Sequence, residues 1–308
     1  MTQIDKSRFE WIGSDSARRE GISRPSTTFW KDAIGRLMKN KVAVVCFFII
    51  VLLILSCIIV PFFSPFESRE QHLGEVNKGF MTVCTDPRYE GQHHVHYFGT
   101  DNLGRDLFLR AFEGGRVSLM IAFAAVFVNL IVGLIYGGIS GYIGGAVDTI
   151  MMRIVEIVNG IPYLIVVILL MMVLPKGIFT MVVAYGITGW TGMARLVRGQ
   201  VLQLKSQEYI VAAEAMGAKS SRIIAKHLIP NALSVIIINV TLAIPSAIFT
   251  EAFLSYIGLG VPVPQPSWGV LAKGGQDVFM TYPYQLVVPA VAVSYTHLRA
   301  HETRSNLV

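Results

Sequence analysis

Apolar runs of roughly twenty residues recur along this chain, with short polar segments between them. An α-helix needs about 20 apolar residues to cross the hydrocarbon core of a bilayer. Inside that core every backbone N–H and C=O must be paired within the structure, and a helix achieves this along an uninterrupted apolar run. We therefore predict an all-α integral membrane protein with six intended spans.

The composition is that of a membrane protein rather than a soluble domain. Hydrophobic residues make up 53% of the 308 positions and charged residues 15%, whereas soluble domains carry about 25% charged residues. The net charge of +6 does not indicate nucleic-acid binding, because the basic residues gather before the first apolar run and between residues 194 and 230. The positive-inside rule places both regions, and therefore the N-terminus, in the cytoplasm.

The apolar runs divide the chain into parts. Residues 1–41 form a cytoplasmic segment that ends in a short amphipathic helix, 42–63 the first span, and 64–115 an extracytoplasmic loop. Residues 116–293 form a core of five spans, with a cytoplasmic polar loop at 194–230. These spans are expected at about 118–142, 154–174, 178–193, 232–253 and from 284 onward.

The sixth apolar run is short. It ends near Val293, and the residues after Ser294 are polar. About ten apolar residues, at 1.5 Å per residue, cover roughly half of a hydrocarbon core of ~30 Å. We expect a truncated or replaced sixth helix, with residues 294–308 as a tail foreign to the rest of the chain that arises from a frameshift, a truncation or a sequence-assembly artefact. The proline-rich stretch 258–269 is expected to be a loop outside the membrane, because proline interrupts helices.

The segment Glu208–Pro230 is polar although apolar runs flank it on both sides. Alanines such as Ala212 and Ala213 favour a helix, and Gly217 favours a break or turn after it. The following residues, Ser220–Leu228, predict a second short helix that ends before Pro230. Two short helices joined at an angle would form a compact projection on the cytoplasmic face. The alternative is an ordinary charged loop that connects two spans.

Several short motifs follow one another in a fixed order. They are Phe98–Asp101 with Gly104–Asp106, Gly115–Leu119, Gly141–Tyr142 with Asp148, Ala194–Gln200, the 208–230 segment, and Phe253–Gly260 with Ser267–Gly269. With these motifs the chain resembles, along almost its whole length, the C-type permease subunit of oligopeptide and dipeptide ABC importers. The general importer pattern begins Glu-Ala-Ala, but Val211 stands at the glutamate position, and in this the chain is similar to the peptide-importer branch.

The resemblance implies a MetI-like permease bundle in the cytoplasmic (inner) membrane of a bacterium. Its implied partners are membrane lipid, a second permease subunit of the B type, two ATP-binding cassette ATPases and an extracytoplasmic peptide-binding protein. ATP and Mg²⁺ would be bound by the ATPases, since the chain has no GxxxxGK[ST] motif. We expect no catalytic, cofactor or metal site in this chain, and no nucleic-acid partner.

The resemblance also assigns the 208–230 segment to contact with an ATPase. Ala212, Ala213 and Gly217 would shape it, and Arg222 and Lys226 could pair with acidic ATPase residues. The residues expected to carry this coupling are Glu208, Tyr209, Ala212, Ala213, Gly217, Arg222, His227 and Pro230.

A polar motif precedes the second span. It could contact the binding protein or order the outer gate, or it could be a self-satisfied charge network that holds the loop, since Arg–Asp pairs hydrogen-bond readily. The motif comprises Gly99, Thr100, Asp101, Gly104, Arg105 and Asp106.

Four ionisable residues near the core spans are candidates for the pathway or a gate, because charges at membrane depth are costly and are usually paired or functional. We expect Arg153 to bridge Asp148 or Glu156. Glu251 could line the pathway or the outer gate, or could reach solvent from the end of its span.

Histidines in the predicted outer loop raise the question of a metal site. His93, His94 and His96 lie close together in sequence, with His72 and Cys84 before them. We find no ligand spacing typical of a metal site and predict an exposed, solvated histidine cluster.

Three other functions stay open. Nickel and dipeptide importers share the same motifs. An ion-coupled secondary transporter would carry inverted repeats and midplane charges, and we find no clear repeat. A membrane scaffold without transport activity would use the 208–230 segment for docking alone.

Overall fold

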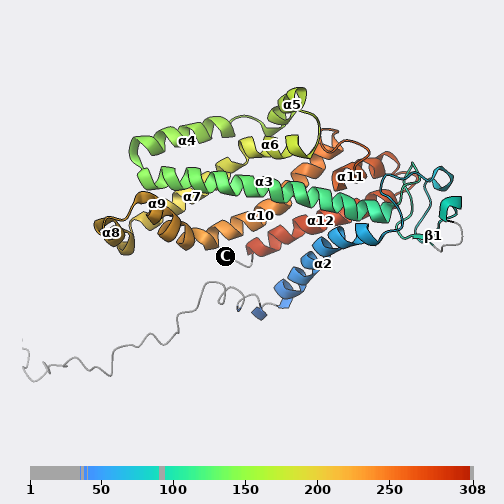
Figure 1. Ribbon diagram of the computed structural model, residues 1–308, viewed down its shortest axis with the longest axis horizontal. Coiled ribbons are helices and arrows are strands. Elements are labelled where there is room, and N and C mark those ends of the chain that lie inside the picture. Colours follow the sequence, from blue (N-terminus) through green and yellow to red (C-terminus); the bar gives the residue numbers. More distant parts are fainter. Residues whose placement is uncertain (1–34, 36–37, 40, 90–93, 306–308) are drawn as a thin grey trace, which may run out of the picture. The chain divides into compact units, whose positions relative to one another are not determined.

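The computed structural model describes residues 35, 38–39, 41–89 and 94–305 (Figure 1). Contacts divide the chain into two compact units, Met1–Leu53 and Ile54–Val308. Helix α2, Lys41–Phe63, is almost entirely apolar and contains Pro61 near its end. The amphipathic helix predicted before α2 lies largely outside the described residues.

A polar loop, residues 64–106, separates α2 from α3. Strands β1 (Thr82–Val83) and β2 (Val95–His96) pair antiparallel in this loop. The 3₁₀ turn η3 (Leu73–Glu75) precedes β1, and the 3₁₀ turn η4 (Pro87–Tyr89) lies between the two strands. The loop ends at Asp106, whose carboxylate accepts a hydrogen bond of 2.7 Å from the Leu109 backbone N–H and so caps α3. Because of this cap the helix starts before the apolar run, and the loop is shorter than the predicted 64–115.

Helix α3, Leu107–Ile143, packs along α7, Trp190–Lys205, and against α10, Ile229–Tyr256 (Figure 1). The helices α3 and α7 approach closely at Gly137, where an added Cβ would lie 2.3 Å from the backbone oxygen of Ala194. Small residues allow helices in lipid to pack with their backbones close together. The glycine-rich end of α3 is therefore a packing surface for α7.

The predicted third span, 154–174, consists of two helices rather than one. Helices α4, Gly145–Asn159, and α5, Tyr163–Val173, are bent by 77° at the break between them. Pro162 stands at the start of α5, where it has no N–H to continue the hydrogen bonding of α4. The break follows from that proline, so the prediction of one continuous span over 154–174 is wrong.

The predicted fourth span, 178–193, is also divided. Helix α6, Ile178–Thr188, ends at Gly189, and α7 continues from there to Lys205. A Cβ at Gly189 would lie 2.4 Å from the side-chain nitrogen of Asn129, so this glycine permits close packing on α3. The first part of the predicted polar loop 194–230 is therefore helical and packed rather than a free connection.

The C-terminal part contains three long or medium helices. Helix α10 is preceded by α9, Ser220–Ile223, and by a π-helical turn, η5, Ile224–Leu228, and the three form one continuous helix. Helix α11, Trp268–Asp277, was not predicted. Helix α12, Tyr284–Ser305, has an apolar part that ends at Ser294, while the helix itself continues.

Among the described residues, two helices are long and apolar enough to cross a membrane, namely Leu107–Ile143 and Ser220–Tyr256. The bent pair α4–α5 makes a third candidate if it counts as one span. Two further apolar helices, Phe47–Phe63 and Tyr284–Ser294, are shorter. The predicted sixth span corresponds to α12, whose apolar part is short, and the predicted fourth span corresponds to the divided pair α6 and α7.

Candidate functional site

The 208–230 segment is anchored to two core helices. It opens with α8, Glu208–Ala215, whose Ile210 is buried in a cluster with Tyr142 of α3 and Val201 of α7. The Tyr142 hydroxyl donates a hydrogen bond of 3.0 Å to the Glu214 carboxylate. The ammonium of Lys205 donates one of 2.6 Å to the Tyr142 backbone oxygen. A force on α8 would therefore pass directly to α3 and α7.

Gly217 ends α8 in a left-handed conformation, with φ of +79°. The Gly217 N–H donates to the oxygen of Glu214 at 2.9 Å, and the Ala218 N–H donates to the oxygen of Ala213 at 3.1 Å. This pair of bonds is the Schellman motif, which favours glycine because other residues are strained at positive φ. The structure thus gives a physical reason for the glycine at the predicted turn.

The second helix of the segment does not end before Pro230, as we had predicted. Pro230 lies in the first turn of α10, and the helix runs through it from Ser220. Proline lacks an N–H and crowds the carbonyl four residues earlier. The π-helical turn η5 lies at that point and widens the helix, so the chain continues instead of breaking.

Most residues assigned to coupling face outward. Val211 and Met216 are 56% and 82% exposed, although both are apolar. Of the residues expected to carry coupling, Ala213 is buried and His227 is half-buried, while the exposed ones are Glu208, Tyr209, Ala212, Gly217, Arg222 and Pro230. The segment therefore presents an apolar tip, around Met216, within a polar and basic surface.

Asp148 pairs with Arg198 rather than with Arg153. The Arg198 guanidinium donates two hydrogen bonds of 2.5 Å to the two Asp148 oxygens, and the Ser140 hydroxyl donates a third. Arg153 instead pairs with Glu156 at 2.8 Å on the exposed face of α4. The bidentate pair joins α4 to α7 across fifty positions of sequence, so it belongs to the packing of the bundle.

Glu251 is buried, so of its two predicted alternatives the one in which it reaches solvent is wrong, while a place on the pathway or outer gate stays a prediction. Its side chain is on α10 and is 2% exposed. Its two oxygens accept hydrogen bonds from the hydroxyls of Ser118, at 2.5 Å, and Ser255, at 2.7 Å. The Ser118 hydroxyl also accepts from the Trp268 backbone N–H at 3.2 Å. Glu251 thus joins α3, α10 and the start of α11 in one polar network.

The motif before α3 is a closed charge network. Asp101 accepts hydrogen bonds from the Arg105 side chain at 2.7 Å and from its backbone N–H at 3.0 Å. The Thr100 hydroxyl accepts from the Lys78 N–H at 2.8 Å and donates to the backbone oxygen of Glu75. All of Thr100, Asp101, Arg105 and Asp106 are buried. This geometry favours the self-satisfied reading, while a role at the outer mouth stays a prediction.

The two glycines of that motif lie where a side chain would not fit. Gly99 and Gly104 both have positive φ, of +77° and +73°. An added Cβ at Gly104 would lie 2.0 Å from the backbone oxygen of His72, and one at Gly99 would lie 2.2 Å from that of Lys78. The two glycines therefore let the motif backbone pack directly against the backbone at His72 and Lys78.

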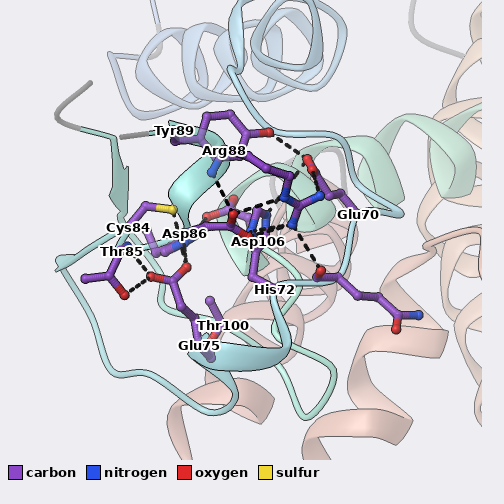
Figure 2. A network of polar contacts seen from close by, with 12 residues as sticks. Glu70, His72, Glu75, Cys84, Thr85, Asp86, Arg88, Tyr89, Thr100 and Asp106 are labelled. Atoms are coloured by element: carbon purple, nitrogen blue, oxygen red, sulfur yellow. Dashed lines mark hydrogen bonds and ion pairs between the residues drawn. The ribbon is translucent and has the colours of Figure 1, made fainter. Parts of the chain in front are cut away.

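The loop histidines are buried, so the prediction of an exposed, solvated cluster is wrong for His72 and His96. They are 1% and 0% exposed. His96 Nδ1 is 2.7 Å from Asp106, and His96 Nε2 is 3.1 Å from Glu75. His72 Nδ1 is 2.8 Å from Asp86 (Figure 2). Glu75 and Asp86 could not be recognised from the sequence, because their distances from the histidines in sequence give no metal or catalytic spacing. His93 lies outside the described residues.

The buried groups of this loop have shifted pKa values. Burial lowers the pKa of His96, but Asp106 and Glu75 outweigh it and raise that pKa above its ordinary value. Burial raises the pKa of Glu75, yet hydrogen bonds led by Thr85 lower it overall. Burial and the nearby Glu75 raise the pKa of the Cys84 thiol to about 11. Hydrogen bonds from Arg88 lower the pKa of Asp86.

Comparison with known proteins decides the family. The family model described as "Binding-protein-dependent transport system inner membrane component" matches residues 129–301, and the model of the N-terminal TM domain of oligopeptide transport permease C matches residues 28–79. The chain belongs to this transport-system inner membrane family. The family match ends at residue 301 and so extends past Ser294, where the apolar part of α12 ends.

Relatives in this family align over almost the whole chain. The oligopeptide transport system permease protein OppC of Bacillus subtilis strain 168 is 47% identical over 96% of this chain and 93% of its own length. The dipeptide transport system permease protein DppC of the same organism is 45% identical over 90% of this chain and 83% of its own. The family is one of multi-pass inner-membrane proteins.

A solved structure shares the fold. A chain of the MetNI methionine ABC transporter, in an inward-facing conformation, aligns with a TM-score of 0.52 and 20% identity over 65% of this chain and 95% of that chain. The predicted MetI-like bundle is thereby confirmed.

Proposed function

We propose that this chain is the C-type permease subunit of an ATP-driven peptide importer and forms half of its translocation pathway. The observation that carries the proposal is the similarity, at 47% and 45% identity over nearly the whole chain, to permeases named for oligopeptides and dipeptides. Its partners would be a B-type permease, two ATPases that bind ATP and Mg²⁺, and an extracytoplasmic peptide-binding protein. The N-terminus would be cytoplasmic.

The 208–230 segment supports an account of the coupling. An exposed apolar residue such as Met216 is costly in water and gains by burial against a partner. Exposed basic residues nearby, Arg222 and Lys226, suit an acidic rim around that contact. When the ATPases close on ATP, a segment seated between them would move with them. The contacts of α8 with Tyr142 and Val201 would pass that motion to α3 and α7.

Energy enters such a machine through differential affinity. ATP can shift the permease between inward-open and outward-open states because the ATPases bind it more tightly in one of them. Peptide delivered from outside would then enter the outward-open state. Hydrolysis would take place in the partner ATPases, and this chain would supply the path and the mechanical link.

Transport by the assembled complex in liposomes tests the proposal. We expect a labelled oligopeptide to accumulate only when ATP is supplied on the side of the ATPases and the binding protein on the other. Uptake that follows a proton or sodium gradient without ATP would instead identify a secondary transporter. ATP-driven uptake of Ni²⁺ but not of peptides of any length would reject the peptide cargo.

A further inference from the structure

The 64–106 loop contains a buried set of metal-ligating atoms. One ligand atom each from His72, Glu75 and Cys84 lies within 4.8 Å of the other two. The Nε2 atom of His96 lies 3.1 Å from the same Glu75 carboxylate, and the Cys84 sulfur lies 3.3 Å from it. All four side chains are less than 9% exposed. Figure 2 shows the Cys84 sulfur and the Glu75 carboxylate facing each other.

One nitrogen of these side chains has no hydrogen-bond partner in the described part of the chain. His72 Nε2 is buried and has no hydrogen-bond partner among the described residues. The carboxylate oxygen of Glu70 nearest to it is 3.9 Å away, beyond hydrogen-bond distance. Buried polar atoms are normally paired, and an unpaired one in a native structure calls for an explanation, of which a bound ion is one.

Both histidines are oriented as metal ligands are. The opposite ring nitrogen of His72 is held by Asp86 at 2.8 Å, and that of His96 is held by Asp106 at 2.7 Å. A carboxylate on Nδ1 fixes the ring and leaves Nε2 as the nitrogen that can bind an ion, which is the arrangement found around zinc-bound histidines. Asp86 is in turn held by Arg88 at 2.6 Å, so these carboxylates are themselves positioned.

We propose that His72, Glu75 and Cys84 bind a structural Zn²⁺ ion, and that His96, whose Nε2 lies 3.1 Å from Glu75, moves in to supply the fourth ligand. Zinc takes four ligands from histidine, cysteine and carboxylate in a tetrahedron, with bonds of about 2.0–2.3 Å. Such bonds separate the ligand atoms by about 3.3–3.8 Å, close to the separations between Glu75 and its two neighbours. A mixed nitrogen, sulfur and oxygen set suits zinc better than Mg²⁺ or Ca²⁺, which prefer oxygen ligands alone.

The ion would fasten the loop to the bundle. Two ligands come from η3 and its flank, one follows β1, and His96 ends β2, while Asp106 both holds His96 and caps α3. A single ion would thus join η3 and the two strands of the loop to the N-cap of α3. The site is independent of the peptide cargo, so its test does not depend on transport.

Metal analysis of the full-length chain in detergent tests the proposal. We expect about one Zn²⁺ per chain after purification in zinc-containing buffer, and Co²⁺ substitution should give the thiolate-to-cobalt absorption of a tetrahedral site. Removal of the ion with a strong chelator should lower the thermal unfolding midpoint, and added Zn²⁺ should restore it.

Two variants and a control locate the ion. Cys84→Ser should abolish the thiolate-to-cobalt band, and Asp86→Asn, which removes the carboxylate that orients His72, should weaken zinc affinity by about 10–100-fold. Cys57→Ser is the matched control, since Cys57 is also a buried free cysteine but lies in α2; it should bind zinc as the parent chain does. If the parent chain binds no stoichiometric zinc, or if Cys84→Ser and Asp86→Asn bind it unchanged, the proposal is wrong.

Discussion

Gly137→Ala is expected to lower the thermal unfolding midpoint of the purified chain by at least about 5 °C. The added Cβ would lie 2.3 Å from the backbone oxygen of Ala194, far inside van der Waals contact. That neighbour is backbone, so it cannot rotate away, and α3 and α7 must move apart along their shared surface. Thermal unfolding in detergent, followed by tryptophan fluorescence, measures the effect.

The adjacent residue provides the control. At Gly138 an added Cβ would lie 3.4 Å from the Ile224 side chain, which is an ordinary contact. Alanine is also preferred over glycine inside a helix by about 1 kcal/mol. Gly138→Ala should therefore leave the midpoint unchanged or raise it. Equal loss of stability in both variants would contradict the packing of α7 on α3.

Gly217→Trp is expected to reduce the stimulation of ATPase activity by peptide-loaded binding protein by about tenfold or more in the assembled complex, a size typical of coupling energies. No atom of the described part of the chain lies within 4 Å of an added Cβ at Gly217. A large side chain there would meet the partner and not its own fold. Comparison of basal and stimulated ATPase rates in nanodiscs measures the change.

Gly217→Ala separates the effect of size from the effect of backbone strain. Both variants place a side chain at φ +79° and carry a similar backbone cost, of about 1–2 kcal/mol. We expect the alanine variant to keep most of its stimulation and the tryptophan variant to lose it. Unchanged stimulation in Gly217→Trp, in a complex that still assembles, would show that no ATPase contact lies at this turn.

The architecture could be predicted from the sequence where it depends on local pattern. Runs such as 118–142 are long and apolar enough to indicate α3, and the order Ala212, Ala213, Gly217 indicated a helix with a turn after it. Both follow from length and propensity, which act within a short stretch of chain. The resemblance carried by the ordered motifs then gave the family.

The breaks in the helices were harder to predict. Pro162 divides the third apolar run, yet Pro230 lies inside a continuous helix, because the π-helical turn η5 makes room for it. A proline in the sequence therefore does not by itself predict whether a helix breaks or continues. Gly189 stands at the end of α6 and packs closely against Asn129 of α3, and that contact depends on the tertiary fold.

Pairings between distant residues could not be predicted at all. Arg198 was visible as one of several basic residues, but its partner Asp148 is on another helix. The position of Glu251 near the end of its apolar run left open whether it reaches solvent, whereas in the structure it is buried and accepts hydrogen bonds from Ser118 and Ser255. The loop histidines looked exposed because the loop is polar, but its small fold buries them among carboxylates.

The most direct test of the account is photo-cross-linking from the tip of the 208–230 segment. A photoreactive residue in place of Met216, which is 82% exposed, is compared with one in place of Met280, which is 96% exposed and lies between α11 and α12. In the assembled complex we predict that position 216 cross-links to an ATPase subunit and that position 280 does not. ATPase cross-links from position 280 and none from position 216 would contradict the assignment of this segment to coupling.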